Sequence, residues 1–360
     1  MSPEAVFRVV EAGLQATIQD AGRPGLGALG VPRSGACDPM GLAVANLLVG
    51  NRPDAPVLEC AIAGPELLVL RDVVVGLAGA DLGAVARPSG RRLGIASAHA
   101  LEAGERLVLA GSGPGSGSGS GSGSGPRSGP VTRTGSAGAG CRAYLAVPGG
   151  FAAATVLGSA STSLVGGFGG LDGRPLRVGD ELLAVGPGLD DRRLAGHRWP
   201  ADLALPQPGD AAAILAGPAA EGEAGGIALA TLVGMTWRVA AASDRRGLRL
   251  EGPALGLAVP SDGPSHGVPT GTIQVAPSGL PMVLLPDAGP TGGYPILAIV
   301  ASADRSIPGQ ARPGGTIRFR LVDIDAARAA ERDRRHVLEA GAARLGMTDP
   351  WDDLPDLAGA

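Results

Sequence analysis

One short pattern recurs three times along the chain, and it constrains the fold more than any other feature. Each copy is a turn with glycine that leads into an apolar run, at Ala100–Leu109, Pro175–Ala184 and Gln310–Phe319. Glycine supplies positive φ in the turn, and the run that follows has the residues of a β-strand. Three such units, spread over the chain, predict a repeated β architecture and not an alternation of strands and helices.

A predicted hairpin in the second half carries the strongest functional signal. Ile273–Val275 and Met282–Leu285 are β-type runs, and a Pro-Ser-Gly turn separates them. A loop over 286–295 follows, with Asp287 and Tyr294 near its two ends. Its small residues would let a ligand approach the backbone, so both side chains are candidates for function. The alternative is that glycine and proline only shape a turn there.

A second candidate site lies where a loop meets a helix in the first half. Asp38 is a good N-cap and Pro39 suits the first helical position, so the apolar spacing predicts a helix that ends at Gly50. Arg23 and Ser34 lie on the loop before this helix. Together with the free amides of the helix start, Arg23, Ser34 and Asp38 could bind an anion. Helix capping alone is the simpler explanation of Asp38.

The composition argues against several classes of function. The net charge is −4 and there is no basic block, so we expect no nucleic-acid partner. The four histidines and three cysteines are scattered, which predicts no transition-metal site. Because no segment resembles a signal peptide or a membrane span, we expect a cytoplasmic protein without a membrane partner.

Lysine is absent from the sequence, so all 30 residues of the Lys and Arg class are arginine. The chain therefore cannot form a lysine Schiff base, and it lacks a Walker-type lysine for ATP. It also offers no lysine amine for covalent attachment of biotin. Any ATP or biotin that the protein uses must be held in another way or by a partner.

The length predicts about two domains, each with its own core. Alternating serine and glycine predict a disordered insertion over about 111–130, within a hairpin. An Ala- and Arg-rich segment near the C-terminus predicts a helix with Asp325 as its cap. The predicted units are a first β subdomain over 1–205, a second over 206–324, and a C-terminal helix with an acidic tail over 325–360.

Several motifs, in the same order along the chain, resemble those of a known family. They are the run QDAGRPGLGALGVPRSGACD from Gln19, Leu58-Glu59, Arg142–Val147, Ser243–Arg245, Gly271–Val275 and Thr291–Pro295. The match extends from about Gly13 to about Leu321. On these motifs the chain is similar to the biotin-dependent carboxyltransferase family, also called allophanate hydrolase subunit 2. Bacterial members look like the C subunit of 5-oxoprolinase, and the group includes the antagonist of a sporulation-kinase inhibitor.

The resemblance implies a mainly β fold of two cyclophilin-like β-barrel subdomains, with few short helices and a C-terminal helix. It also implies a hydrolase that opens the lactam of 5-oxoproline to glutamate, driven by ATP. The chain would act with the B subunit of that enzyme, which is similar to the kinase inhibitor, and with its A subunit. Two alternatives stay open: a regulatory module that binds an inhibitor-like partner, or the carboxyltransferase half of a urea carboxylase or allophanate-type system with a separate biotin carrier.

The motifs also suggest site residues. We predict polar or acid–base roles for Asp287 and Tyr294, and positioning of a phosphorylated intermediate by Asp244 and Arg245. ATP is the expected cosubstrate, bound by this chain or elsewhere in the complex. Contacts with the small-molecule substrate are predicted for Gln274, Ser265, His266, Thr291, Gly292, Gly293, Arg23, Ser34 and Asp38.

Overall fold

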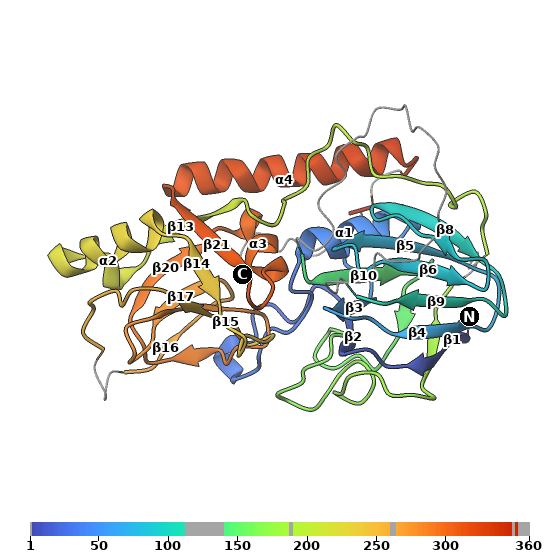
Figure 1. Cartoon of the computed structure of the whole chain (residues 1–360), viewed down its shortest axis with the longest axis horizontal. Coiled ribbons are helices and arrows are strands. Elements are labelled where there is room, and N and C mark those ends of the chain that lie inside the picture. The colour runs from blue at the N-terminus through green and yellow to red at the C-terminus, as the bar shows by residue number, and fades with distance from the viewer. Residues whose placement is uncertain (1, 112–139, 187–189, 260–263, 348–349, 352–360) are drawn as a thin grey trace, which may run out of the picture.

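Two β-rich halves lie side by side, and a long helix crosses both of them (Figure 1). The fold is therefore mainly β with a C-terminal helix, as the sequence predicts. Of the insertion predicted at 111–130, all but Gly111 lies outside the described residues. The computed structural model describes residues 2–111, 140–186, 190–259, 264–347 and 350–351.

The first half consists of two sheets that pack about one core. The larger sheet has the order β11 (Phe151–Ala152), β12 (Glu181–Ala184), β1 (Glu4–Glu11), β4 (Glu66–Val69), β9 (Arg106–Leu109), β6 (Ala84–Arg87) and β7 (Arg91–Arg92). The smaller sheet has the order β2 (Gln15–Gln19), β3 (Val57–Ala61), β10 (Arg142–Ala146), β5 (Val73–Gly79) and β8 (Ser97–Leu101). Phe7 and Leu67 of the larger sheet share a buried core with Leu58 and Leu145 of the smaller one.

The second half is a closed barrel. Its strands follow the order β13 (Ala211–Ala216), β20 (Ile296–Val300), β17 (Thr272–Val275), β18 (Pro281–Leu284), β15 (Gly247–Glu251), β14 (Trp237–Val239) and β21 (Thr316–Leu321). Trp237 and Phe319 fill the barrel together with aliphatic side chains. A two-stranded ribbon, β16 (His266–Gly267) with β19 (Thr291–Gly292), lies beside it.

Most of the predicted local structure is confirmed. The two strands β17 and β18 pair antiparallel, as the predicted hairpin requires. The three repeated units end in β9, β12 and β21, so each turn does feed a strand. Among the described residues, the connections between strands and helices contain short 3-10 helices: η1 (Gly27–Leu29), η2 (Pro218–Ala220) and η3 (Ser302–Asp304).

The first helix, α1 (Pro39–Leu48), covers the outer face of the smaller sheet. Its N-cap is Asp38, whose side chain accepts a hydrogen bond from the Gly41 amide, and Pro39 is at the first helical position. Val44 and Leu48 of this helix are buried with Val74 of β5. The helix is buried on nearly every side because α4 lies against it.

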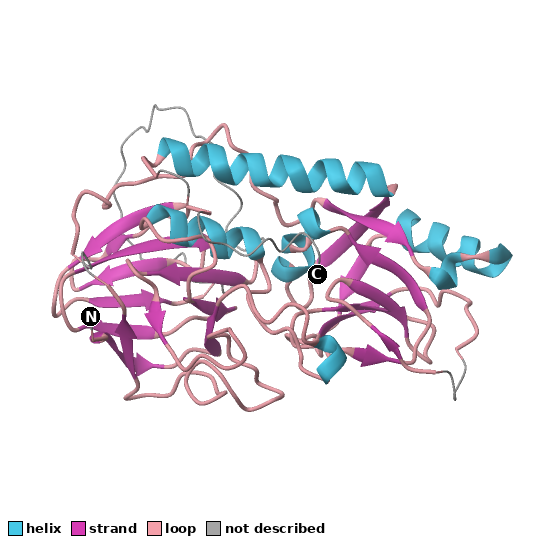
Figure 2. Cartoon of the chain, turned by 180° about the vertical axis from the view of Figure 1, so that it is seen from behind, coloured by secondary structure: helices cyan, strands magenta, loops and turns pink. Residues whose placement is uncertain are grey.

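The last helix, α4 (Ile324–Arg344), lies across both halves (Figure 1, Figure 2). Its N-cap is Asp323, which accepts from the Ala326 amide at 2.8 Å, so the prediction of Asp325 as the cap is wrong. Asp323 and Asp325 both lie near the start of α4, and the hydrogen bond from the Ala326 amide identifies Asp323 as the cap. Leu338 of α4 packs into the cluster formed by α1 and Trp199, and the short helix α3 (Ser306–Gln310) fills the junction below.

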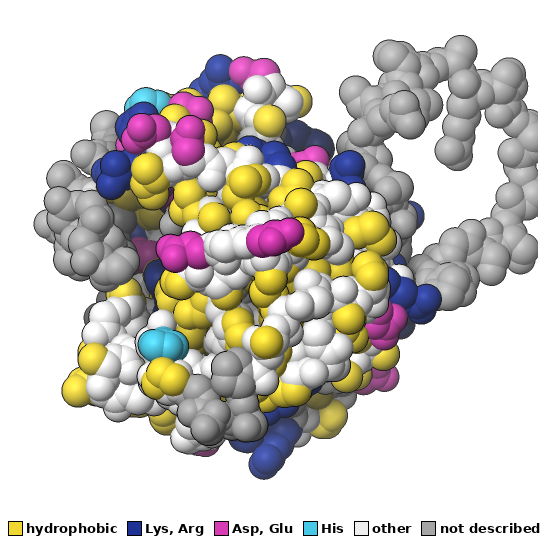
Figure 3. Space-filling view, turned by 90° about the vertical axis from the view of Figure 1, so that its left-hand side faces the viewer, with side chains coloured by type: hydrophobic (Ala, Val, Ile, Leu, Met, Phe, Trp, Pro, Cys, Tyr) yellow, Lys and Arg dark blue, Asp and Glu magenta, His cyan; other side chains and the backbone are white. Residues whose placement is uncertain are grey.

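Besides the short helix α3, the sequence analysis did not predict the helix α2 (Gly222–Gly234). No side chain caps its start, and its glycines and alanines give a weak helical pattern. Ala228 and Leu232 anchor it on the barrel core, so tertiary packing decides its conformation. Its outer side leaves Ile227 60% exposed, and apolar side chains cover much of the face seen in Figure 3.

The domain limits predicted at residues 205 and 324 stay a prediction. β12 ends at Ala184 and β13 begins at Ala211, so the boundary at 205 falls between two strands. Among the described residues, no helix has the length and apolar character needed to cross a membrane.

The contact between α1 and β5 leads to a test of packing. A Cβ atom on Gly76 would lie 2.3 Å from the carbonyl oxygen of Ala45, whereas a Cβ on Gly226 of α2 would meet open space. We expect Gly76→Ala to lower the free energy of unfolding by about 1 to 3 kcal/mol. Gly226→Ala should raise it by up to about 1 kcal/mol, because alanine is the better helix former. Urea unfolding of both variants measures this, and equal effects would contradict the packing described for α1.

Candidate functional site

A buried ion-pair network joins the two halves of the molecule. Arg245 stands just before β15, and its side chain is 2% exposed. Its Nε donates to Asp287 Oδ2 at 2.9 Å, and its Nη1 contacts Glu59 of the first half. Its Nη2 donates to the Gly35 carbonyl at 2.7 Å and to Asp287 Oδ1 at 3.3 Å. One planar guanidinium therefore binds a carboxylate from each half.

Glu59 is the first half's charge in this network, and it lies on a strand that is buried throughout. β10 places Tyr144 opposite Glu59, and the Tyr144 hydroxyl donates to Glu59 Oε2 at 2.7 Å. The Cys37 amide donates to the same oxygen at 2.8 Å. Arg142 Nε lies 3.5 Å from Glu59 Oε1. Together with Arg245, two guanidiniums balance two carboxylates, as buried ions require.

The network continues to the start of α1. The Asp38 amide donates to the Tyr144 hydroxyl at 2.8 Å, and Asp38 Oδ2 accepts from Gln310 Nε2 at 2.7 Å. The Arg142 amide donates to Gln310 Oε1 at 2.9 Å. Because Asp38 Oδ1 also caps the helix, both of its oxygens are bonded within the protein. This geometry supports the capping explanation, and a contact between Asp38 and substrate stays a prediction.

Burial and charge set the protonation states of the network. Burial alone would raise the pKa of Glu59, but Arg245 and Arg142 outweigh it and hold that pKa below its usual range. Burial would lower the pKa of Arg245, but the negative charges beside it, Glu59 and Asp287 among them, instead raise it well above its ordinary value. Burial raises the pKa of the Cys37 thiol to about 12, so this cysteine is not an activated nucleophile.

The Arg23 side chain forms hydrogen bonds with a loop of small residues over 151–174. Its Nε donates to the Val156 carbonyl at 2.8 Å, and its Nη2 donates to the carbonyls of Ser159 and Ser161. Its guanidinium carbon also lies 4.8 Å from the centre of the Phe168 ring. Arg23 is 2% exposed and bonds to this loop, whereas Asp38 caps α1, so the two side chains are held by different partners. An anion site formed by Arg23, Ser34 and Asp38 stays a prediction.

Six of the predicted residues do meet in a hollow on the barrel surface, with a volume of about 270 Å³. The hollow is also lined by Arg246 and Arg249, which add positive charge. It lies against β15, β17 and β18, beside the loop over 286–295. The predicted residues in it are Asp244, Gln274, Thr291, Gly292, Gly293 and Tyr294.

The polar groups of this hollow differ in exposure. The Asp244 side chain is 47% exposed and pairs with Arg246 Nε at 3.0 Å, while Tyr294 is 38% exposed. Gln274 is buried, and its Nε2 donates to the Tyr294 carbonyl at 3.2 Å. A Cβ on Gly292 would lie 2.7 Å from Gln274 Nε2, so a side chain at 292 would have to displace the Gln274 amide. Tyr294 and Asp244 can therefore reach a ligand, and Gln274 supports the loop.

The remaining predicted residues lie outside the hollow. Ser265 and His266 are exposed, and β16 pairs His266 with Gly292 of β19. Arg245 and Asp287 are buried behind the hollow, at 2% and 1% exposure, and are bonded to each other. The sequence predicts that these two residues act on the substrate directly. In the structure, Arg245 forms ion pairs with Asp287 and with Glu59.

Sequence reasoning did not assign Glu59, Tyr144, Arg142 and Gln310 to the site. A signal for two of them exists in the sequence: Glu59 and Tyr144 each interrupt an apolar run with a polar group. A charge inside a buried strand needs a partner, but the sequence does not say that Arg245, 186 residues away, supplies it.

Comparisons with known proteins agree with this architecture. The family model for the carboxyltransferase domain, subdomain A and B, matches residues 29–118 and 126–321. The C subunit of 5-oxoprolinase from Escherichia coli (strain K12) is 32% identical over 343 residues, which are 94% of this chain and 99% of that protein. A putative urea carboxylase of Emericella nidulans is 30% identical over 89% of this chain and 24% of that protein.

A solved structure shows the same fold. The crystal structure of the urea amidolyase of Kluyveromyces lactis superposes with a TM-score of 0.76 at 24% identity. The superposition covers 94% of this chain and 20% of that one. The arrangement of both halves thus recurs as one part of a much longer protein.

The buried pair leads to a test of stability. Removing one partner leaves the other charge buried without compensation, so Arg245→Met and Asp287→Asn should each lower the free energy of unfolding by about 3 to 5 kcal/mol. The exposed neighbour provides a matched control, because Arg246→Gln breaks only a surface ion pair and should cost less than about 1 kcal/mol. Denaturant unfolding of the three variants would contradict the network if Arg245→Met and Arg246→Gln had similar effects.

The lowered pKa of Glu59 also predicts a pH dependence. Its carboxylate stabilises the folded chain fully above the ordinary glutamate pKa of about 4.3. That stabilisation is lost as the pH falls through the lower pKa of the folded state. In Glu59→Gln the side chain cannot ionise, so the stability gap between wild type and variant should shrink as the pH drops below about 4. Urea unfolding from about pH 7 to pH 3 measures the gap, and a gap independent of pH would refute an ionised Glu59.

Proposed function

Because the chain belongs to the family of the carboxyltransferase domain, subdomain A and B, we propose that it is the C subunit of an ATP-dependent 5-oxoprolinase. The relative of that name supports this choice, because the match spans 94% of this chain and 99% of the relative. The chain therefore corresponds in extent to that relative. The urea carboxylase relative, by contrast, is matched over 24% of its length.

The proposed reaction hydrolyses the lactam of 5-oxoproline to glutamate. An amide carbonyl is a poor electrophile at neutral pH, and phosphorylation of its oxygen by ATP would activate it. We propose that the B and A subunits supply the groups that this chain lacks, including a nucleotide site with a lysine. Both partner subunits, ATP and the cytoplasmic location all belong to this proposal.

Within this chain, the hollow on the barrel is the proposed contact with substrate. Tyr294 and Asp244 are exposed polar groups there, and Arg246 and Arg249 suit a ligand with negative charge. Gln274, Thr291, Gly292 and Gly293 would contact the ligand through the loop. The hollow lies open to solvent, which suits a site that a partner subunit completes.

Arg245 and Asp287 take the role of positioning residues in this proposal. Their ion pair ties the segment of Asp244 to the loop that carries Tyr294, and the Asp287 amide also donates to the Arg245 carbonyl at 3.1 Å. Loss of the pair would let the two walls of the hollow separate. The pair would thus influence turnover through the geometry of Asp244 and Tyr294.

One alternative has its own support. The 30% identity with a putative urea carboxylase favours a carboxyltransferase half of such a system, with biotin on a separate carrier. This chain has no lysine to which biotin could be attached. A regulatory module that only binds an inhibitor-like partner is the second alternative, and both would fail to release glutamate from 5-oxoproline.

The test is ATP hydrolysis and glutamate release from 5-oxoproline by this chain alone and mixed with the B and A subunits. We expect turnover only in the mixture. Asp244→Asn and Tyr294→Phe should reduce it by about 100-fold if these groups act in proton transfer. Arg328→Gln, on the exposed side of α4, is the matched control and should keep wild-type turnover. A stable complex without glutamate release would refute the proposed function, and a carboxylated urea product in the presence of a biotin carrier would favour the first alternative.

A further inference from the structure

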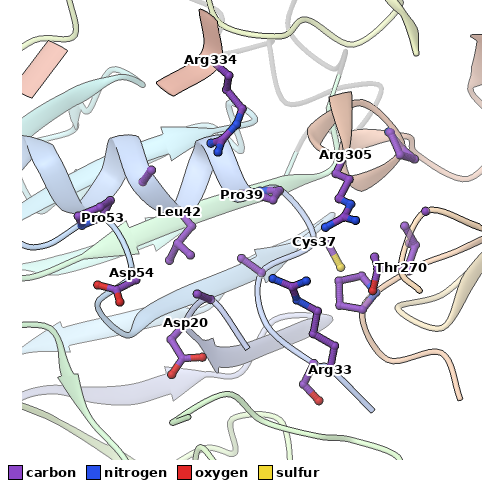
Figure 4. Close-up of a pocket in the computed structure, with 18 of the residues that line it drawn as sticks. Asp20, Arg33, Cys37, Pro39, Leu42, Pro53, Asp54, Thr270, Arg305 and Arg334 are labelled. Carbon is purple, nitrogen blue, oxygen red and sulfur yellow. The ribbon is translucent and has the colours of Figure 1, made fainter. Parts of the chain in front are cut away.

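A cavity of about 210 Å³ lies at the junction of the two halves, away from the hollow on the barrel surface. Its walls come from the loop before α1, from α1 itself, from the barrel loops at 270 and 284–286, and from α4. Leu42, Leu285 and Pro286 make part of it apolar. Arg33, Arg305 and Arg334 also line it, so three guanidiniums from three segments gather at one cavity (Figure 4).

Two of these arginines have no partner within the described part of the chain. Among the described residues, neither the Arg33 nor the Arg305 side chain forms a hydrogen bond or an ion pair. The Nε of Arg305 is buried and unbonded there, and so is the hydroxyl of Ser34 in the same wall. In Figure 4 the Arg33 and Arg305 guanidiniums point into the same space from opposite sides. Buried donors without acceptors are costly, which calls for an acceptor from outside the chain.

The nearby carboxylates do not neutralise this charge. Asp20 accepts from the hydroxyls of Ser159 and Ser161 and from two backbone amides. Asp54 pairs with Arg52 at the surface. Glu331 pairs with Arg334 through that arginine's Nε at 3.1 Å. Within the described residues, no carboxylate therefore forms an ion pair with Arg33 or Arg305.

The pKa shifts of the two arginines agree with the absence of an ion-pair partner among the described residues. The pKa of Arg305 is lowered to about 10, first by burial and then by the charge of Arg33, which Glu331 offsets in part. Burial also lowers the pKa of Arg33. Partial burial thus disfavours the charge of both arginines, and the charge of Arg33 adds to this at Arg305; a bound anion would offset both effects.

We propose that this cavity binds the oxyanion group of a small molecule, with Arg33 and Arg305 as its ligands and the Ser34 hydroxyl as a further donor. Guanidinium groups match the geometry of carboxylate and phosphate, and the apolar wall accommodates a short carbon skeleton. A second hollow of about 650 Å³ shares Arg33, Thr270, Pro286 and Arg305, so the bound group is accessible from that side. The proposal does not depend on the proposed function, because no step of it involves the hollow of Asp244 and Tyr294.

Binding to the full chain without ATP or partner subunits tests the proposal. Calorimetric titrations in a buffer low in chloride would use inorganic phosphate, 5-oxoproline and 2-pyrrolidinone, which is the same lactam without the carboxylate. We expect phosphate or 5-oxoproline to bind and 2-pyrrolidinone not to bind. Binding of phosphate alone would assign a phosphoryl group to the site, and binding of 5-oxoproline alone would assign a carboxylate.

Variants then locate the binding. Arg305→Gln and Arg33→Gln should each weaken binding by about 10-fold or more, since each removes a charge-assisted hydrogen bond. Arg305→Gln should also raise the melting temperature of the ligand-free chain, because it removes a partly buried charge that has no ion-pair partner among the described residues. Arg328→Gln, an exposed arginine on α4, should change neither quantity. The proposal is overturned if neither anion binds, or if both bind to Arg305→Gln as they do to wild type.

Discussion

The contact of Arg245 with Glu59 and Asp287 is the interaction on which the rest of this structure depends. Each half has its own apolar core, and apolar contacts alone would not specify how the two halves meet. A guanidinium that is 2% exposed does specify it, because any other arrangement would leave a buried charge without its partner. The Ser34 amide adds a backbone hydrogen bond to the Pro286 carbonyl at the same place.

The network also explains where ligands can reach the molecule. Asp287 and Arg245 fix the two segments that form the barrel hollow, and Glu59 and Tyr144 fix the start of α1. Around this buried network lie two spaces lined by arginines, one with Arg246 and Arg249, the other with Arg33 and Arg305. The first lies on the barrel surface and the second at the junction of the two halves. Both are lined by arginine because the chain has no lysine.

Local structure could be predicted well where a single short segment determines it. The turn and strands of β17 and β18, and the helix that begins with Asp38 and Pro39, follow from residues within a few positions of each other. Prediction failed where neighbours in space decide the outcome. The helix α2 forms because Ala228 and Leu232 dock on the barrel. The wrongly predicted cap of α4 is a different case, because Asp323 and Asp325 lie two residues apart and only the hydrogen bond from the Ala326 amide identifies Asp323.

The sequence by itself determined the mainly β fold, the start of α1, the loop of Asp287 and Tyr294, and the use of arginine in place of lysine. Each of these depends on residue type or on contacts a few residues apart. The tertiary structure alone decided what each charge does. It pairs Arg245 with Glu59 over 186 residues, and it divides the predicted site into a buried pair and an exposed hollow. It also places Arg33 and Arg305 at one cavity, facing each other. The physical reason is that charges interact according to their distance in space and not according to their distance along the chain.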